Sequence, residues 1–145
     1  MEHMEHIENN KKIITELNID ELKLLQTTMD KQLLIIKFGA EWCGPCKKIA
    51  PSYQEFIKKC PVNIICADIN VDSNLDLYMG LKKAKMVQSI PVFLAFWGGI
   101  KRDAWYIPDD SVIGSDEKTV GDFFNRCVYK ATEMNVKQDC YSYFS

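Results

Sequence analysis

The sequence predicts an α/β fold, a central mixed β-sheet flanked by helices on both faces. Short apolar runs rich in β-branched residues, typical of buried strands, alternate with segments whose apolar residues recur every three or four positions, as in amphipathic helices. This alternation indicates strands joined by helical crossovers. Two adjacent glycines at 98–99 indicate an antiparallel hairpin late in the chain, which would make the sheet mixed.

Composition and charge narrow the class of protein. The chain has 145 residues, 47% hydrophobic and 26% charged, as expected for one soluble globular domain. A net charge of −2 argues against a nucleic-acid partner. No run approaches the ~20 apolar residues that span a bilayer, so no membrane partner is expected. The polar N-terminus lacks the apolar core of a signal peptide, which favours the cytoplasm or the nucleus.

The first elements are a strand, a helix and a second strand. An apolar run at 12–17 predicts the first strand. Asn18 and Glu21 have the spacing of a capping box and predict a helix that ends near Met29. The apolar run at 33–38 then predicts a buried strand.

A pair of cysteines follows the 33–38 strand, where the next helix begins. Cys43 is expected at or just before the helix N-terminus, where unpaired N–H groups and the positive end of the helix dipole favour a thiolate. Cys46 follows about one turn later, close enough for a small disulfide ring. Pro45 fits the first turn, whereas Pro51 predicts a kink further along. This arrangement predicts a reversible dithiol.

The second half continues the alternation. An apolar strand is expected at 63–69, and Asp72 or Ser73 is expected to cap the next helix. That helix carries an apolar set formed by Leu75, Tyr78, Met79 and Leu81. A further strand is expected within 87–97, and the last helix within 116–131.

The predicted domain organisation is simple. Residues 1–11 are expected to be a flexible tail, and 12–134 a single domain. Within it, 100–114 is unusually long and polar for a hairpin connection. Residues 135–145 are expected to be a second tail.

Three features of the sequence resemble the thioredoxin family. They are the run Phe-Gly-Ala-Glu-Trp-Cys-Gly-Pro-Cys-Lys at 38–47, a proline in the following helix, and Ile90-Pro91 later in the chain. The likeness covers about residues 12–131. It implies the thioredoxin fold and a dithiol–disulfide oxidoreductase that needs no bound cofactor. A bare Cys-x-x-Cys also occurs in zinc sites, but we expect no metal here. Neither Cys60 with Cys66 nor the two N-terminal histidines supply a second ligand pair at suitable spacing.

The resemblance implies roles for individual residues. Cys43 would be the nucleophile that forms a mixed disulfide with the substrate, and Cys46 would resolve it. Pro91 matches the family's cis-proline, beside which substrate backbone can pair as an added strand. The docking patch around the sulfurs would consist of Trp42, Gly44, Pro45, Ile90 and Pro91.

The dipeptide between the cysteines bears on the direction of the reaction. A histidine there would stabilise the thiolate and make the pair more oxidising, whereas Gly-Pro offers no such charge. We therefore expect a protein-disulfide reductase. The resemblance implies disulfide-containing proteins as substrates and a thioredoxin reductase or another dithiol donor as the electron source. We expect the protein to act as a monomer.

Two positions depart from the thioredoxin pattern. Lys37 stands where the family usually has a buried Asp that helps to take the proton from the resolving cysteine, and Gly39 where it usually has a Trp. On the neighbouring strand, Asp68 replaces the usual Lys. Because a buried lysine needs a partner, we predict a Lys37–Asp68 ion pair in which Asp68 relays a proton and Lys37 favours thiolates. The alternative is that Lys37 extends to solvent.

The same strand also resembles a second class. Spliceosomal thioredoxin-like proteins share a basic-Phe-Gly start and an extended segment before the last helix, but lack the cysteine pair. The alternative function is therefore a thioredoxin-fold interaction or scaffold module with secondary redox activity. The 100–114 segment, with Trp105 and Tyr106, could be its partner surface, or a partner surface added to a working redox domain.

Four more cysteines are scattered along the chain: Cys60, Cys66, Cys127 and Cys140. Without a secretion signal, six cysteines do not predict a disulfide framework, and each of these four is expected to be an incidental thiol. The alternatives are a second redox or regulatory disulfide, or dimer formation through Cys127 or Cys140. Of the four, Cys140 is expected to be the most exposed.

Overall fold

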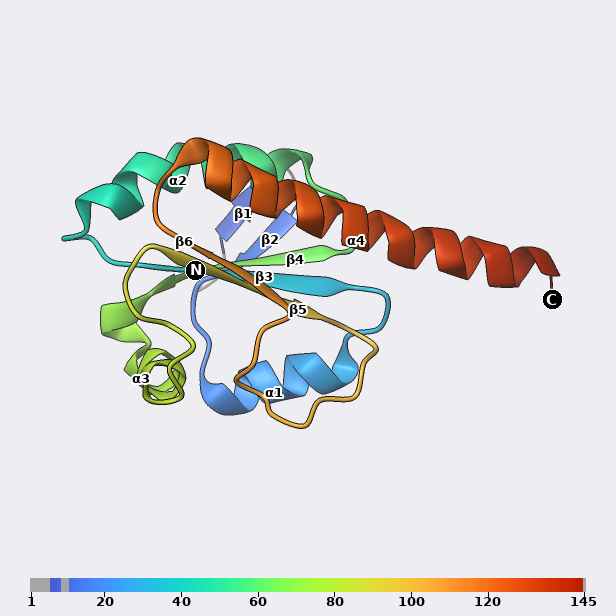
Figure 1. The fold of residues 1–145 in the computed structure, drawn as a ribbon, viewed down its shortest axis with the longest axis horizontal. Coiled ribbons are helices and arrows are strands. Elements are labelled where there is room, and N and C mark those ends of the chain that lie inside the picture. The colour runs from blue at the N-terminus through green and yellow to red at the C-terminus, as the bar shows by residue number, and fades with distance from the viewer. Residues whose placement is uncertain (1–5, 9–10, 145) are drawn as a thin grey trace.

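One mixed sheet of six strands forms the centre of the fold (Figure 1). The computed structural model describes the backbone of residues 6–8 and 11–144 and the side chains of residues 11–135. The strands are β1 (His6–Glu8), β2 (Lys11–Ile14), β3 (Leu33–Gly39), β4 (Ile64–Asn70), β5 (Val92–Trp97) and β6 (Asp110–Ile113), in the spatial order β1-β2-β4-β3-β5-β6. β2, β4 and β3 are parallel, and β1, β5 and β6 each pair antiparallel with a neighbour. The predicted fold class is confirmed.

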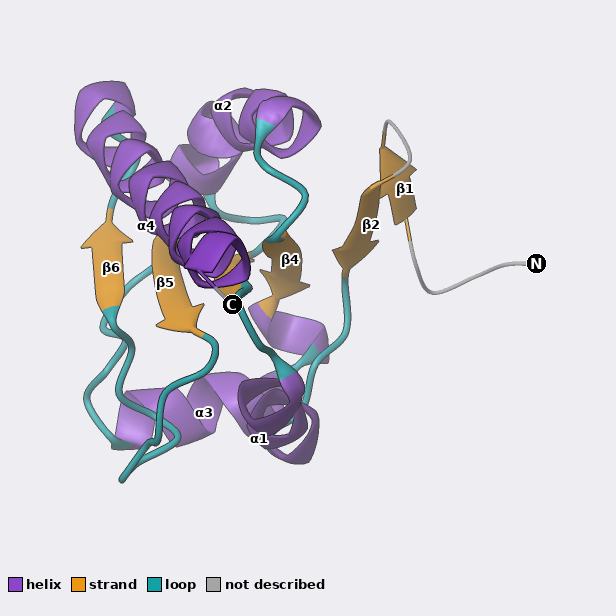
Figure 2. Ribbon diagram, turned by 90° about the vertical axis from the view of Figure 1, so that its right-hand side faces the viewer, coloured by secondary structure: helices purple, strands orange, loops and turns teal. Residues whose placement is uncertain are grey.

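Helices cover both faces of the sheet. They are α1 (Ile19–Thr28), α2 (Gly44–Lys59), α3 (Leu75–Lys83) and α4 (Glu117–Phe144), with a short 3₁₀ helix η1 (Val71–Ser73). α2 and α4 lie on one face, and α1 and α3 on the other (Figure 2). Every residue of the central strand β3 is buried. Its side chains alternate, so Leu34 and Ile36 pack in the core under α1 and α3, whereas Leu33 and Ile35 pack under α2 and α4.

The helix α1 begins with the capping box that the sequence predicts. Asn18 Oδ1 accepts a hydrogen bond from the Glu21 backbone N–H at 2.8 Å, and Glu21 Oε1 accepts one from the Asn18 N–H at 2.9 Å. The predicted capping box is therefore confirmed. The helix ends at Thr28, with Met29 as its C-cap, close to the predicted end.

The start of α3 differs from the prediction. Asp72 and Ser73 do not cap this helix, because both belong to η1. Asn74 is the N-cap residue and makes no capping hydrogen bond with its side chain. Its Oδ1 instead accepts from the Leu17 N–H at 2.9 Å, which ties the segment before α1 to the start of α3.

The apolar face of α3 was also predicted in part only. Tyr78 and Leu81 are buried as expected, but Leu75 and Met79 are 55% and 53% exposed. Leu77 takes their place in the core. In a helix, Leu77 shares a face with Tyr78 and Leu81, whereas Leu75 and Met79 lie one turn apart on another face.

The connection after β5 is shorter than the predicted 100–114. Residues 98–109 join β5 to β6, because Asp110–Ile113 pairs with Val92–Ala95. Arg126 on α4 makes two hydrogen bonds to the Asp110 carboxylate, which fixes the start of β6 against α4.

The chain ends also differ from the two predicted tails. α4 continues through 135–144, for which a loose tail was expected. No glycine or proline follows Gly121, so no residue of those types ends the helix earlier. Within 1–11, residues 6–8 form β1, whereas 1–5 and 9–10 lie outside the described residues. None of the helices in the described part of the chain is both long and apolar enough to cross a membrane.

Candidate active site

The two cysteines of the 42–46 segment lie where β3 leads into α2, as predicted. Cys43 is the N-cap residue of α2, and its Sγ accepts a hydrogen bond from the Cys46 backbone N–H at 3.2 Å. The sulfurs form a disulfide, with the two Cα atoms 5.3 Å apart. Pro45 lies in the first turn, where its missing N–H has no helical partner. The site is thus a dithiol in its oxidised state.

The start of α2 favours a thiolate at Cys43 once the disulfide is reduced. The helix has 16 residues, and no acidic residue lies in its first turn. Its unpaired N–H groups and the positive end of its dipole therefore face the sulfur with no carboxylate of the first turn to oppose them. Cys43 is 5% exposed, so a substrate must dock closely to reach it.

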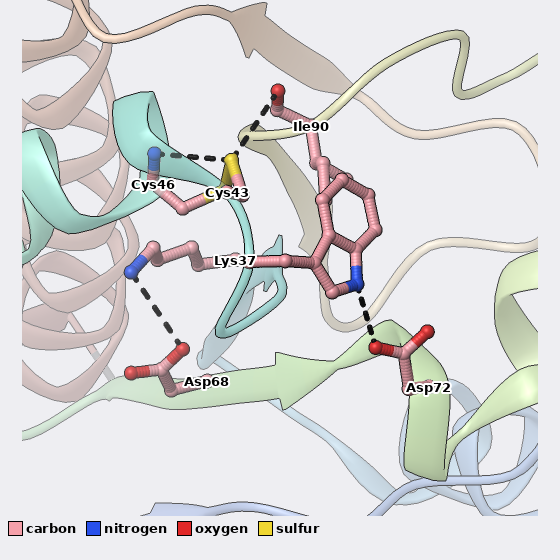
Figure 3. Close-up of a disulfide and its surroundings, with 7 residues drawn as sticks. Lys37, Cys43, Cys46, Asp68, Asp72 and Ile90 are labelled. Atoms are coloured by element: carbon pink, nitrogen blue, oxygen red, sulfur yellow. Dashed lines mark hydrogen bonds and ion pairs between the residues drawn. A yellow bond between two sulfur atoms is a disulfide. The ribbon is translucent and has the colours of Figure 1, made fainter.

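The loop before β5 lies beside this disulfide. The Ile90–Pro91 peptide bond is cis, as the resemblance implied. The Ile90 carbonyl oxygen is 3.9 Å from Cys43 Sγ (Figure 3). Pro91 is buried, and its carbonyl oxygen accepts from the Gly114 N–H at 2.9 Å, which holds the loop against the end of β6. Substrate backbone placed along residue 90 would therefore pass the sulfur of Cys43.

An exposed tryptophan borders the sulfurs on the solvent side. Trp42 is 70% exposed, and Gly44 and Pro45 are exposed next to it. Trp42 Nε1 donates to Asp72 Oδ2 at 2.8 Å, which fixes the orientation of the ring (Figure 3). Sequence reasoning missed this contact because it assigned Asp72 to a helix cap. The topology could have indicated it, because Trp42 follows β3 and Asp72 follows β4, and the carboxyl ends of neighbouring parallel strands meet at one edge of the sheet.

Lys37 and Asp68 lie opposite each other on the neighbouring strands β3 and β4. Lys37 Nζ is 3.9 Å from Asp68 Oδ1 (Figure 3). Because Lys37 is only 5% exposed, it does not extend to solvent, and the structure has the ion pair that the sequence predicted. Burial raises the pKa of Asp68 above its ordinary value, and the charge of Lys37 opposes this rise.

A cavity of about 330 Å³ connects this pair to the resolving cysteine. It is lined by Lys37, Gly39, Ala40, Glu41, Cys46, Lys47, Ala50, Asp68, Ile69 and Asn70. A Cβ at Gly39 would lie 3.4 Å from both Cβ and Sγ of Cys46, so the glycine leaves space next to this sulfur. The cavity has both the room and the polar groups to hold water between Asp68 and Cys46.

The aromatic residues of the 98–109 segment pack inward. Trp105 and Tyr106 are half-buried against the core under α1 and α3. The Trp105 carbonyl oxygen accepts from Gln26 Nε2 at 2.9 Å, and Lys23 Nζ lies 5.9 Å from the centre of the Trp105 ring. These contacts attach the segment to α1, so the two aromatic side chains do not form the open surface expected for an interaction module.

Three further cysteines in the described part of the chain are free thiols: Cys66 and Cys127 are buried, and Cys60 is partly exposed. Hydrogen bonding to Cys60 and burial raise the pKa of Cys66, and burial raises the pKa of Cys127 to about 12. Cys60 is half-buried and lies 2.8 Å from Lys11 Nζ. The side chain of Cys140 lies outside the described residues.

The fold and the site define one class of protein. A Cys-Gly-Pro-Cys disulfide begins a helix after the central strand of a mixed sheet, next to a cis-proline. Among the side chains described for 11–135, no three His, Cys, Asp or Glu residues gather as metal ligands, and the two N-terminal histidines fall outside that range. A reversible thiol–disulfide couple is the chemistry that these groups support.

Comparison with known proteins names the family. The Thioredoxin family model matches residues 8–108, so the chain belongs to the thioredoxin family. Thioredoxin of Geodia cydonium is 34% identical over 87 residues, which are 60% of this chain and 76% of that protein. Thioredoxin-T of Drosophila melanogaster is 34% identical over 82 residues, 57% of this chain and 50% of that protein. This chain thus spans about half the length of the fly protein.

Solved structures agree with this assignment. The crystal structure of Schistosoma mansoni thioredoxin superposes with a TM-score of 0.57 at 26% identity, covering 79% of this chain and 92% of that chain. Family membership and the close cysteine pair together support thiol–disulfide oxidoreductase chemistry at Cys43 and Cys46.

Proposed function

We propose that this protein is a protein-disulfide reductase that cycles between the Cys43–Cys46 dithiol and its disulfide. The observation that carries the proposal is the position of Cys43, at the N-cap of α2 and 3.9 Å from the Ile90 carbonyl of the cis-proline loop. The helix start stabilises the attacking thiolate, and the loop offers backbone to an extended substrate.

The first step is attack by the Cys43 thiolate on a substrate disulfide. The S–S bond of the substrate breaks, one substrate sulfur leaves as a thiolate, and a mixed disulfide joins the other to Cys43. Trp42, Gly44, Pro45 and Ile90 form the surface on which the substrate docks, whereas Pro91, expected in the same patch, is buried and holds Ile90 beside Cys43 through its cis peptide bond. Asp72 holds the Trp42 ring in place for this contact through its 2.8 Å hydrogen bond.

The second step releases the substrate. Cys46 loses its proton and attacks Cys43 Sγ, so the mixed disulfide breaks, the second substrate sulfur leaves as a thiolate and the Cys43–Cys46 disulfide forms. Asp68 accepts the proton of Cys46 through water in the cavity that both residues line. Lys37 keeps Asp68 ionised enough to act as a base, because its charge opposes the effect of burial.

The oxidised protein then needs two electrons from outside. A thioredoxin reductase or another dithiol donor would supply them, since the described residues include no further cysteine next to the Cys43–Cys46 pair. The substrates are proteins that carry accessible disulfides.

Insulin reduction with dithiothreitol as donor tests the proposal. The wild type should accelerate the reaction well above dithiothreitol alone, and Cys43→Ser should lower it to that background. Cys60→Ser is the matched control, because Cys60 lies at the other end of α2. It should retain the wild-type rate. A wild type no faster than dithiothreitol alone would show that the reductase proposal is wrong.

A further inference from the structure

Cys60 is a free cysteine, distant from the dithiol, whose sulfur contacts a lysine. It is the C-cap residue of α2 and is half-buried. Lys11, from β2, places its Nζ 2.8 Å from Cys60 Sγ and also donates to the carbonyl oxygens of Pro61 and Ile64 at 3.0 and 3.1 Å. Since three acceptors hold it, the ammonium group is fixed against the sulfur.

The groups around this sulfur favour its negative charge. Hydrogen bonding with Cys66 from β4 and with Lys11, together with the positive charge of Lys11, lowers the pKa of Cys60 below its ordinary value, while burial opposes this shift. Tyr53, from α2, also interacts with both sulfurs, and burial keeps its pKa high, so it stays neutral. The Lys11 ammonium at 2.8 Å therefore favours the thiolate form of Cys60.

A cavity opens next to the thiolate. It measures about 430 Å³ and is lined by Lys11, Lys12, Ile57, Lys58, Cys60, Val62, Ile64 and Ile65. Three of these residues are lysines and none is acidic. A nucleophilic sulfur in a cavity with basic walls fits a small thiol-reactive molecule that carries carboxylates.

We propose that Cys60 is a second redox site, which takes up a low-molecular-weight disulfide bearing carboxylates, such as glutathione disulfide, as a mixed disulfide. The Cys60 thiolate attacks one sulfur of this disulfide, whose S–S bond breaks. A new S–S bond joins Cys60 to one half, and the other half leaves as a thiolate. Cys60 is oxidised and the departing half is reduced, so no further oxidant is needed.

This site is separate from the proposed reductase centre. Cys43 and Cys60 cap opposite ends of α2, a helix of 16 residues that is about 24 Å long at 1.5 Å per residue. No residue lines both the Cys60 cavity and the cavity beside Cys46. The uptake at Cys60 therefore does not depend on the proposed reductase activity.

The test uses the full chain carrying Cys43→Ser and Cys46→Ser, so that the dithiol cannot reduce the probe. Glutathione disulfide is added at pH 7, and adducts are located by peptide mass spectrometry. The adduct should form at Cys60 at least tenfold faster than at Cys127, whose thiol is buried and protonated. Cystamine, a cationic disulfide, serves as the second probe. The rate of each probe at Cys60 is divided by its rate with a small free thiol, which corrects for the intrinsic reactivity of the probe. Glutathione disulfide should be favoured about threefold or more, and added salt should reduce this preference.

Variants then test the part played by Lys11. Lys11→Met should raise the pH midpoint of the Cys60 reaction by about one unit or more, because a close opposite charge lowers a pKa by 1–3 units. Lys11→Arg should keep the midpoint low, and Lys83→Met, on α3, is the control that should not move it. Equal rates at Cys60 and Cys127, a preference for cystamine, or an unchanged midpoint in a folded Lys11→Met would overturn the proposal. The comparison of glutathione disulfide with cystamine needs no change at Lys11, so it tests the proposal even if the Lys11→Met variant does not fold.

Discussion

The two ends of α2 stabilise a cysteine thiolate by different means. At the N-cap, Cys43 faces the unpaired N–H groups of the helix. At the C-cap, Cys60 lies near carbonyl groups, with its Sγ 3.6 Å from the Ile57 oxygen, and the helix dipole opposes a negative charge there. The Lys11 ammonium at 2.8 Å compensates for that unfavourable position. Helix direction alone therefore does not decide where a reactive thiol can lie.

The cavities at the two ends differ in their proton acceptors. The cavity beside Cys46 includes the carboxylates of Asp68 and Glu41, whereas the described residues that line the cavity beside Cys60 include three lysines and no acid. The first combination suits a dithiol that must deprotonate its second sulfur during turnover. The second suits a thiolate that takes up an anionic disulfide, since the described lining residues include no carboxylate to act as a base in a resolving step.

The largest effect is expected from removing the base at the N-terminal end. Asp68→Asn should slow release of the mixed disulfide by roughly tenfold to a hundredfold, because general bases contribute 10²-fold or more and water replaces part of this one. In the wild type, the release rate should fall as the pH drops through the raised pKa of Asp68, since the protonated carboxyl cannot accept a proton. Stopped-flow measurement of the second step checks both. Asp103→Asn is the exposed control, and equal rates in Asp68→Asn and Asp103→Asn would exclude the base.

A second prediction concerns the ion pair itself. Lys37→Met should lower the free energy of unfolding by about 1 kcal/mol at pH 8, because it leaves Asp68 as a half-buried carboxylate without its counter-charge. The sign follows from linkage. A carboxyl whose folded pKa is raised destabilises the fold increasingly as the pH rises from its unfolded pKa through its folded pKa, so the loss should shrink toward pH 4.

Urea unfolding of Lys37→Met at the two pH values measures this effect. The double variant Lys37→Met/Asp68→Asn should recover most of the lost stability at pH 8, since neither charge is then unpaired. A loss in Lys37→Met that is the same at both pH values would argue against the pair.

Charge reversal should distinguish the two ends of α2. Lys48→Glu should raise the pH midpoint of Cys43 alkylation in the reduced protein by about half a unit, as expected for 0.3–1 kcal/mol of helix-end electrostatics. Lys58→Glu should do the same at Cys60. Neither change should move the midpoint at the far end, where salt screens the interaction. Peptide-resolved alkylation measures both thiols in one sample, and a shift at both ends from one variant would refute local control.

The smallest effect is expected at the docking surface. Asp72→Asn keeps the size of the side chain but replaces the charged acceptor of Trp42 Nε1 with a neutral amide. The KM for a protein disulfide should rise by about twofold to fivefold, with little change in kcat, because the ring loses only part of its fixed orientation. Initial-rate kinetics check this, and a fall in kcat alone would place Asp72 in the chemical steps instead.

Most of the fold could be predicted from the sequence because its signals are local. The capping box at Asn18, the buried strand at 33–38 and the cysteine at the start of α2 each depend on a few neighbouring residues. The Lys37–Asp68 pair was also predictable, because a lysine stands where thioredoxins usually have an aspartate and an aspartate stands where they usually have a lysine, on adjacent strands. The first three features rest on short-range pattern, whereas the pair rests on the thioredoxin pattern, from which both positions depart.

The features that were missed depend on contacts between distant segments. Asp72 bonds Trp42 across 30 residues, and Lys11 reaches Cys60 across 49, so no local pattern marks either pair. The exposure of Leu75 likewise depends on which side of α3 meets the core. Tertiary arrangement decides these positions, and the ammonium group that contacts Cys60 Sγ comes from Lys11 on another strand.

The most direct test of the account is a trapping experiment on Cys46→Ser. This variant keeps Cys43 and Cys60 but cannot resolve a mixed disulfide at the N-terminal end of α2. After reaction with a protein disulfide and peptide mapping, the account predicts a stable adduct on Cys43 and none on Cys60, because the cis-proline loop that would pair with substrate backbone lies beside Cys43. An adduct on Cys60 with Cys43 unmodified would contradict the assignment of the reductase centre.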